Sequence, residues 1–224
     1  LKKLDARVRT LPPLKSAADL EKVAEVRPYG VDASWGALSK GLIRACHEKG
    51  IQVFSDALGP NDTVEQYRKA ITAFRAKYGA RVDDISPWNE VNRKFDPQRG
   101  EGQPTWNRPD IVARYYGVAK RVFPKNKIVA LDVLDQANVK ATVRYIESFK
   151  ATVKKRGLPA VKIWGLHPYS DINRFSTTRT KAMLKAVGKG GDVWLTEASG
   201  LVQFGPDFPY DEQRAAAANK CMFT

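Results

Sequence analysis

The chain has 224 residues, 43% of them hydrophobic and 28% charged, a composition that suits one globular domain with a sizeable core. No apolar run approaches the ~18 residues of a membrane span, and the first residues lack the apolar segment of a signal peptide. A formal net charge of +14 favours anionic partners, but Lys and Arg are scattered over the predicted helix faces and no nucleic-acid-binding motif is found. We therefore expect no membrane partner and no specific nucleic-acid partner, and the cellular location stays open.

Short apolar runs alternate with amphipathic segments along the chain, and Pro, Gly or capping residues separate them. In chain order the predicted elements are a strand at 6–11, a helix at 17–26, a strand at 29–34, a helix at 38–49, a strand at 51–58, a helix at 63–78, a strand at 84–92, a helix at 110–123, a strand at 127–135, a helix at 138–156, a strand at 161–169, a helix at 177–187, a strand at 192–200 and a helix at 211–223. Such strict alternation of β/α units predicts an α/β fold with a parallel sheet covered by helices. No further strand is predicted after the final helix.

The cysteines and histidines limit redox and metal chemistry. Cys46 and Cys221 fall on predicted helices without metal-ligand spacing, and we expect each to be a buried, reduced thiol. His47 and His167 are the only histidines, which excludes a His-rich metal site. The Gly-rich stretch 188–191 precedes a strand instead of following one, so it does not have the form of a phosphate-binding loop. We expect no cofactor and no metal.

Two of the predicted strands end on a glutamate. The strand at 84–92 runs into the polar tip that holds Asn89 and Glu90, and the strand at 192–200 carries Glu197 near its end. An amide beside a strand-end carboxylate can orient both that carboxylate and a hydroxylated substrate. A lone Asn-Glu pair would more often cap loop amides, but two strand-end carboxylates far apart in sequence are what glycoside hydrolysis requires.

These motifs carry a resemblance to a known family. Residues 88–92 (Trp-Asn-Glu-Val-Asn) resemble the acid/base motif of the retaining glycoside hydrolases built on (β/α)8 barrels. Residues 194–197 (Trp-Leu-Thr-Glu) are similar to the nucleophile strand of that clan, and residues 164–169 (Trp-Gly-Leu-His-Pro-Tyr) to the strand between them. The resemblance covers residues 62–223. It implies a (β/α)8 TIM-barrel-like fold that acts on an oligosaccharide or polysaccharide, with Glu90 as general acid/base and Glu197 as nucleophile. The seven predicted β/α units depart from that family by one strand.

Five further residues are candidates for substrate binding, namely Trp88, Asn89, Asp132, His167 and Tyr169. Asn89 would donate a hydrogen bond to a sugar hydroxyl next to the reaction centre. His167 and Tyr169 are two residues apart in a predicted strand and would share one face. The resemblance implies that this pair orients the nucleophile, and a packed, satisfied pair is the alternative.

The predicted strand at 127–135 places a carboxylate among apolar residues. Alternation puts Val129, Leu131 and Val133 on the face that packs under helices. Asp132 would then face the barrel interior with Ala130, where a buried structural carboxylate is favoured over a substrate contact. The longest connection, 91–109, contains Trp106, which could stack on a sugar ring or anchor the loop.

Residues 1–60 carry a second resemblance. The segments 11–13, 29–32 and 47–56 resemble the C-terminal barrel segment of glycerophosphodiester phosphodiesterases, which are also (β/α)8 barrels. The His-Arg-Gly start and the metal-binding acidic residues of that family are not found, so the resemblance implies barrel architecture and carries no catalytic residue. We expect one barrel domain over 1–224. Either it joins two barrel segments near residue 60, or the likeness is convergent.

The barrel is one strand short of closure. The strands at 6–11 and 192–200 lack the neighbour that would join them, and an open sheet edge invites self-association. The same gap leaves an alternative to the hydrolase, a carbohydrate-binding or scaffold barrel with little or no turnover. A phosphodiesterase-related activity is the weaker alternative.

Overall fold

The structure, a computed structural model, describes residues 30–32, 52–55, 63–79, 82–96 and 102–222. The predicted strand at 6–11, the helices at 17–26 and 38–49, and Cys46 lie outside the described residues. The described strands form a six-stranded sheet in chain order, and every neighbouring pair is parallel. The strands are β1 (Gly30–Asp32), β2 (Gln52–Ser55), β3 (Asp84–Ile85), β4 (Lys127–Leu134), β5 (Ile163–His167) and β6 (Asp192–Leu195).

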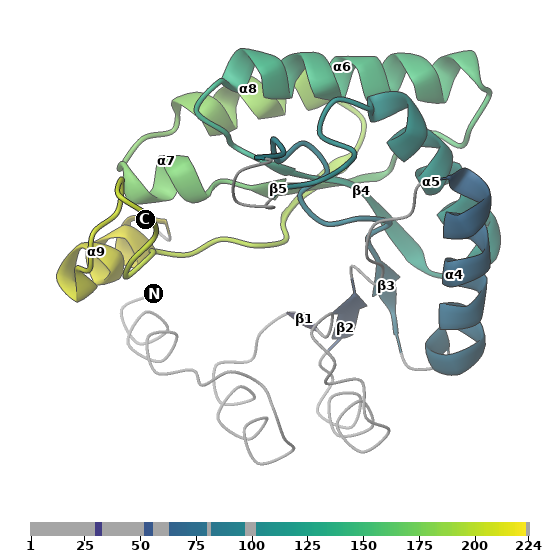
Figure 1. The fold of residues 1–224 in the computed structure, drawn as a ribbon, viewed down its shortest axis with the longest axis horizontal. Helices are drawn as coiled ribbons and strands as arrows, with labels where there is room; N and C mark the ends of the chain where they lie inside the picture. Colours follow the sequence, from purple (N-terminus) through teal and green to yellow (C-terminus); the bar gives the residue numbers. More distant parts are fainter. Residues whose placement is uncertain (1–29, 33–51, 56–62, 80–81, 97–101, 223–224) are drawn as a thin grey trace.

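Helices alternate with these strands, which confirms the predicted α/β fold. Helices α4, α5, α6 and α8 follow one another along one face of the sheet, and α7 packs against α9 beyond the end of β5 (Figure 1). Within the described ranges, every helix is too short or too polar to cross a membrane. The helices are α4 (Val64–Tyr78), α5 (Pro109–Val122), α6 (Val139–Lys155), α7 (Tyr169–Asn173), α8 (Thr178–Val187) and α9 (Glu212–Met222).

Local sequence signals define the ends of the covering helices. Thr63 and Gln66 form a capping box at the start of α4, each side chain accepting a hydrogen bond from the other residue's backbone N–H. Pro109 opens α5 at a position where a missing N–H costs nothing. The Asn138 side chain accepts from Ala141 N–H at the start of α6. These caps explain why the helices were predictable to within one or two residues.

The main core lies between the sheet and α4, α5 and α6. Aromatic rings fill much of it: the Tyr67 and Tyr115 rings stack with centroids 4.2 Å apart, and Trp88 stacks on Tyr115 at 5.5 Å. Trp88 is only 2% exposed, and its indole N–H donates to Gln103 Oε1 at 3.0 Å. This position makes Trp88 a core residue beneath the site. The prediction that Trp88 binds substrate is therefore not supported, because the ring has no free face.

A bulge in β4 changes which side chains face the helices. Leu131 has a left-handed φ of 53°, and the register with β5 shifts between Ala130 and Val133. Ala130 therefore joins Leu131 and Val133 in the main core, whereas Val129 is buried outside that core. The predicted regular alternation was wrong here, because an extra residue in one strand reverses the faces on either side of it.

Several strands are shorter than predicted. The segment expected as a strand at 84–92 is extended only over β3, because Pro87 has no N–H to continue a ladder and the chain bends from that point. β5 ends at His167, and Tyr169 begins α7 instead of continuing the strand. β6 ends at Leu195, so Glu197 lies in the bend that follows it.

Cys221 also differs from its prediction. It is a thiol in the last turn of α9, but it is exposed instead of buried. The buried face of α9 consists of Ala215 and Ala218, three residues apart, and Cys221 continues that spacing at the end of the helix, where the described residues leave it exposed.

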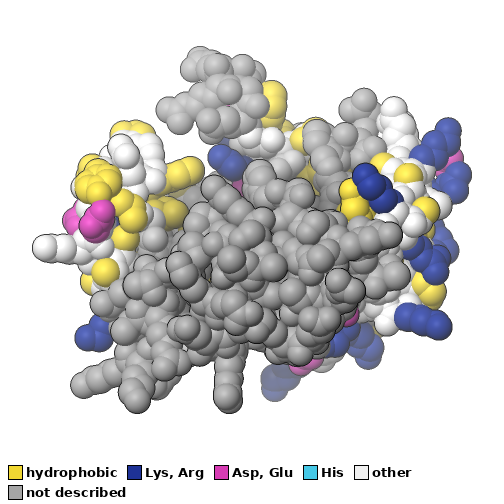
Figure 2. Space-filling model, turned by 90° about the horizontal axis from the view of Figure 1, so that it is seen from below, with side chains coloured by type: hydrophobic (Ala, Val, Ile, Leu, Met, Phe, Trp, Pro, Cys, Tyr) yellow, Lys and Arg dark blue, Asp and Glu magenta, His cyan; other side chains and the backbone are white. Residues whose placement is uncertain are grey.

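The Lys and Arg side chains of the described residues form more than one group on the face shown in Figure 2. The described Lys and Arg side chains lie in separate groups around the rim, most of them on the side of α4. Arg68, Lys69, Arg75 and Lys77 are exposed on that helix. The scatter of basic residues over the whole surface stays a prediction.

Candidate active site

Glu90 lies in the bend after β3, and its backbone is held against β4. Val91 N–H donates to Asp132 O at 3.2 Å, and the Asn92 side chain pairs with Leu134 through both its amide groups, at 2.9 and 2.8 Å. Glu90 itself has a left-handed φ of 43°, an unusual conformation for a residue with a side chain. The backbone bonds on its C-terminal side therefore fix an unfavourable conformation at the residue predicted to be the acid/base.

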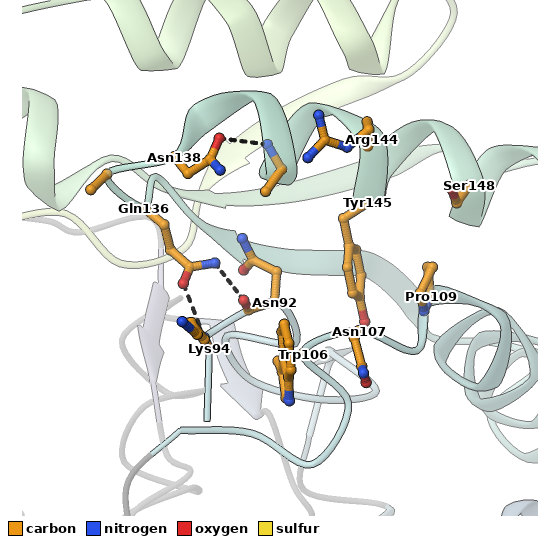
Figure 3. Close-up of a pocket in the computed structure, with 12 residues that line it drawn as sticks. Asn92, Lys94, Trp106, Asn107, Pro109, Gln136, Asn138, Arg144, Tyr145 and Ser148 are labelled. Carbon is orange, nitrogen blue, oxygen red and sulfur yellow. Dashed lines mark hydrogen bonds between the residues drawn. The ribbon is translucent and has the colours of Figure 1, made fainter. Parts of the chain in front are cut away.

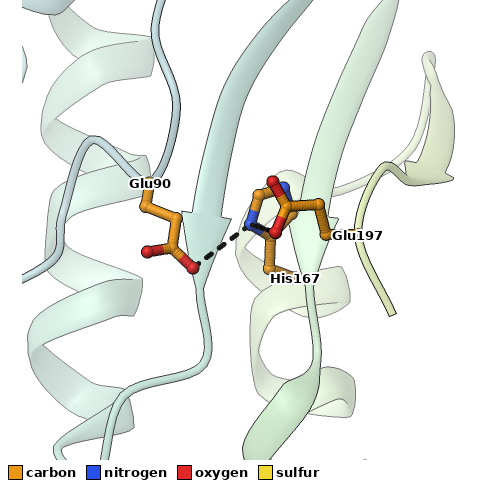
Figure 4. Close-up of side chains that lie close together, drawn as sticks. All are labelled: Glu90, His167 and Glu197. Atoms are coloured by element: carbon orange, nitrogen blue, oxygen red, sulfur yellow. Dashed lines mark hydrogen bonds and ion pairs between the residues drawn. The ribbon is translucent and has the colours of Figure 1, made fainter. Parts of the chain in front are cut away.

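Glu90, His167 and Glu197 meet at the C-terminal ends of the strands (Figure 4). One carboxylate oxygen of each glutamate and a ring nitrogen of His167 all lie within 4.8 Å of one another. His167 Nδ1 is 3.5 Å from Glu90 Oε1 and 3.8 Å from Glu197 Oε2. The glutamate side chains are 11% and 26% exposed, so solvent or a ligand reaches Glu197 more easily than Glu90.

The other ring nitrogen of His167 is held by a relay. The Thr196 hydroxyl donates to Asp132 Oδ1 at 2.5 Å, and His167 Nε2 lies 3.0 Å from the same hydroxyl oxygen. Because that hydroxyl has one proton and donates it to Asp132, it accepts from His167, and Nε2 therefore carries a hydrogen. His167 Nδ1 is then the atom that exchanges a proton with the two glutamates. The relay assigns the tautomer through the hydrogen-bond network.

Gly165 makes room for this relay. A methyl group at Gly165 would lie 1.7 Å from Asp132 Oδ1 and 3.0 Å from Thr196 Oγ1. Asp132 is 1% exposed, as is His167. Asp132 is therefore a buried structural carboxylate that acts through Thr196, which is the alternative that the sequence favoured.

The electrostatics of the cluster favour a proton on His167. Burial is the largest single effect and lowers the pKa of His167, but the hydrogen bond to Glu90 and the charges of Asp132, Glu197 and Glu90 together raise it above its ordinary value. The imidazole is thus a cation up to a higher pH than a histidine in water.

Tyr169 also reaches the site, although it belongs to α7. Its hydroxyl donates to Glu197 Oε2 at 3.1 Å. Burial, followed by the charge of Glu197, raises the pKa of Tyr169, so the hydroxyl stays a donor. Asp135 fixes the start of α7 by accepting from the backbone N–H groups of Ser170 and Asp171 at 2.8 and 2.7 Å, and burial raises the pKa of Asp135 to about 6.

Five of the predicted site residues come together, whereas Trp88 lies in the core and Asn89 is only half-buried. Glu90, His167, Tyr169 and Glu197 come together, and Asp132 lies directly behind them. Asn89 is half-buried, and its Oδ1 has no hydrogen-bond partner in the described part of the chain. Such a buried polar atom is uncommon in folded proteins, and its contact with a sugar hydroxyl stays a prediction.

Sequence reasoning missed several residues that hold the site. Thr196 and Gly165 lie within motifs that the sequence singled out, but neither carries a local signal for its role. Asp135 caps the start of α7, a short helix that was not predicted, from a position 35 residues earlier in the chain than Ser170. Because the two partners are far apart in sequence, no local capping signal could have found this contact.

The three donor atoms of Glu90, His167 and Glu197 could also bind a divalent cation. The two carboxylate oxygens lie 3.5 and 3.8 Å from His167 Nδ1, distances that also fit a histidine paired with two carboxylates. The chemistry available to the described cluster is therefore proton transfer and carboxylate attack, with chelation as a competing property.

The fold and the cluster together define a class: a parallel α/β barrel-type sheet with two carboxylates at the C-terminal ends of its strands. No family profile and no curated protein matches the sequence. Solved structures do match. A psychrophilic glycoside hydrolase family 10 endo-β-1,4-xylanase superposes with a TM-score of 0.57 at 13% identity, over 84% of this chain and 73% of that chain.

A family 10 endoxylanase from a sugarcane soil metagenome superposes with a TM-score of 0.51 at 14% identity, over 88% of this chain and 67% of that chain. At such low identity the likeness shows the fold, which is that of TIM-barrel proteins. The predicted fold class is confirmed. The resemblance of residues 1–60 to phosphodiesterases stays a prediction, since most of that segment lies outside the described residues.

Proposed function

We propose that this protein is a retaining glycoside hydrolase that acts on a polysaccharide or oligosaccharide. The observation that carries the proposal is the approach of Glu90 and Glu197 oxygens to within 4.8 Å, from segments that follow different strands. Retaining enzymes hold their two carboxyl groups ~5–5.5 Å apart, and inverting enzymes ~6.5–9.5 Å apart. The spacing supports retention.

In this mechanism Glu90 protonates the glycosidic oxygen while Glu197 attacks the anomeric carbon, so the bond to the leaving sugar breaks as the glycosyl–enzyme bond forms. Glu90 then takes a proton from water, whose oxygen displaces Glu197 and restores the starting configuration. Tyr169 donates to one oxygen of Glu197 and leaves the other for attack. His167 Nδ1 lies beside both carboxylates and can share a proton with Glu90 as its charge changes.

The first substrates to test are β-1,4-xylan and an aryl β-xyloside, because both structural neighbours are described as endoxylanases. We expect hydrolysis with retained anomeric configuration, read by NMR of the first product. Glu197→Ala should lower kcat roughly 10³-fold or more, since it removes the nucleophile. Azide, which fits the space of the lost carboxylate, should partly restore turnover and give a glycosyl azide of inverted configuration.

Glu147→Ala serves as the matched control, because Glu147 is an exposed carboxylate on α6. It should leave kcat unchanged. If the Glu197→Ala protein hydrolysed the aryl glycoside as fast as the wild type, with far-UV circular dichroism unchanged, the assignment of the nucleophile would be wrong.

One observation favours the carbohydrate-binding or scaffold alternative. His167 pairs with both carboxylates, and a cation held between them competes with the protonated form of Glu90 that the mechanism needs. Wild-type protein that binds xylan without cleaving it at any pH from 4 to 8 would select this alternative. Metal-dependent cleavage of a phosphodiester would select the phosphodiesterase-related one.

A further inference from the structure

We propose that the pocket between the β3–α5 connection and α6 is a second carbohydrate-binding site, and that it takes a sugar bearing a carboxylate, such as a uronic acid residue of a polysaccharide. The pocket has a volume of about 710 Å³. Figure 3 shows Trp106 on the loop side and Arg144 on α6 opposite it. The proposal deepens the proposed function, on which it rests, by naming a substrate class.

The described residues that line the pocket carry charge of one sign. Lys94 and Arg144 are the charged residues among those that line it, and no carboxylate is among them. Both side chains are exposed, and no carboxylate of the described residues lies within ion-pair distance of either. Two such cations facing one cavity are suited to a carboxylate ligand, and the guanidinium can hold it with two parallel hydrogen bonds.

Trp106 supplies an aromatic surface to the same cavity. Its side chain is 38% exposed, and it was the residue whose role the sequence left open. A flat indole can pack against the C–H face of a sugar ring while polar groups around it bind the hydroxyls. The combination of one aromatic platform and two cations distinguishes this pocket from a merely basic surface.

Hydrogen bonds hold residues 91–94 and Thr105, which precedes Trp106, before any ligand binds. The Tyr145 hydroxyl is 2.9 Å from Thr105 O and 3.3 Å from Val91 O, and the Thr105 hydroxyl donates to Val91 O at 2.9 Å. Gln136 binds the backbone of the same loop through Lys94 N–H, at 3.0 Å, and through Asn92 O. A pocket held in this way loses little conformational entropy on binding.

Amide groups complete the lining. Asn107 and Asn138 are exposed at the cavity, and the Asn138 carbonyl oxygen caps α6, which leaves its NH2 group to donate. Such donors suit sugar hydroxyls and a carboxylate alike.

The pocket lies next to a second cavity that reaches Tyr169 of the candidate active site. That cavity, of about 380 Å³, shares Gln136 and Ala137 with the pocket and is also lined by Tyr169. Tyr169 in turn binds Glu197. A polysaccharide whose reacting sugar lies at Glu197 can therefore follow these two cavities along the strand ends and place an acidic sugar between Trp106 and Arg144.

A polysaccharide fits this path better than a nucleic acid. A polynucleotide carries a phosphate at every residue, and Glu90 and Glu197 at the far end of the path would repel each one that approached them. A glycan can be neutral at the reacting sugar and charged only where Lys94 and Arg144 lie.

The test uses cellotetraose and an acidic derivative of it in which one terminal glucose is replaced by glucuronic acid, so that the two ligands differ only in one carboxylate. Binding is measured by isothermal titration calorimetry at low salt with Glu197→Gln protein, so that turnover does not interfere. We expect the acid to bind about tenfold tighter than cellotetraose. The double variant Lys94→Ala/Arg144→Ala should erase that difference, and Trp106→Ala should weaken both ligands about tenfold.

Lys155→Ala is the matched control, because it removes one charge from the exposed surface of α6 about three turns from Arg144. It should leave both affinities unchanged. Equal affinity for acid and neutral ligand, or a loss with Lys155→Ala as large as with the double variant, would overturn the proposal.

The octanucleotide dT8 is titrated in parallel. Binding tighter than that of the acid, and abolished by the double variant, would overturn the proposal in favour of a nucleic-acid site. Weak dT8 binding supports the glycan. Binding is measured in an inactive variant, so it is independent of hydrolysis. If the wild type failed to hydrolyse glycans, the binding result would still hold. If binding were not selective for the acid, the binding-site proposal would be refuted even if hydrolysis were found.

Discussion

The backbone of Glu90 adopts a left-handed conformation that costs a residue with a side chain ~1–2 kcal/mol. Strain of this kind persists where the surroundings enforce it, and it occurs often at functional sites. Here the bond from Val91 N–H to Asp132 O, and that from Arg93 N–H to Glu90 O at 2.8 Å, enforce it. We infer that the strain serves to aim the carboxylate at His167.

Glycine adopts this conformation without cost, which makes the strain measurable. Glu90→Gly and Glu90→Ala remove the same carboxylate, so both should abolish turnover. We expect the glycine variant to be more stable than the alanine variant by ~1 kcal/mol, in the free energy of unfolding from urea titration. An alanine variant as stable as the glycine variant would show that Glu90 is not held at positive φ.

The raised pKa of His167 predicts a pH dependence of stability. A histidine whose folded pKa exceeds its unfolded value of ~6.5 stabilises the fold fully below that value, and the stabilisation is lost as pH rises through the folded pKa. The difference in urea midpoint between wild type and His167→Gln should therefore shrink as pH rises from 5.5 to 8.5. A difference that grew with pH would contradict the charge assignment.

At the scale of elements, the bulge in β4 and the missing side chain at Gly165 in β5 together make room for the Asp132 carboxylate. The bulge lets Leu131 and Val133 pack under the helices while Asp132 points to the other side, over Gly165. Neither element alone would create the space in which Asp132 supports Thr196 and, through it, His167.

Gly165→Ala tests this arrangement. The added methyl group would overlap Asp132 Oδ1, so the carboxylate must move and release Thr196. We expect a loss of ~1–3 kcal/mol in unfolding free energy and a lower kcat, because His167 loses its support. Gly79→Ala is the control: Gly79 has a φ of −57°, and its methyl group would meet the exposed Arg75 side chain at 2.9 Å, so we expect a change within ~0.5 kcal/mol.

At the scale of the whole molecule, the sheet ends at β6 among the described strands. β6 pairs with β5 on one side, and Leu195 on it is 50% exposed. A sheet edge that presents an apolar side chain favours pairing with another chain. The predicted neighbour of β6, the strand at 6–11, lies outside the described residues.

We therefore expect concentration-dependent self-association, measured by light scattering coupled to size-exclusion chromatography. Leu195→Lys should reduce it, because a charge on an edge strand opposes pairing. Leu184→Lys on α8, where Leu184 is 41% exposed, should leave it unchanged. A monomer at every concentration would show that this edge is closed within the chain.

The sequence by itself determined the alternation of strands and helices and the two glutamates that follow separate strands. Both follow from local physics: apolar periodicity sets the elements, and caps such as Thr63 and Pro109 set their ends. Because parallel strands present their C-terminal ends at one edge, Glu90 and Glu197 were expected at the same edge.

Only the tertiary structure decided how these residues meet. The positive φ of Glu90, the bulge at Leu131 and the start of α7 at Tyr169 depend on contacts with chain segments 30 or more residues away, which no local pattern encodes. Trp88 is a second example of what the sequence could not decide. Its neighbours in sequence belong to the site, but its ring is buried against Tyr115. Packing decides on which side of the sheet a side chain lies.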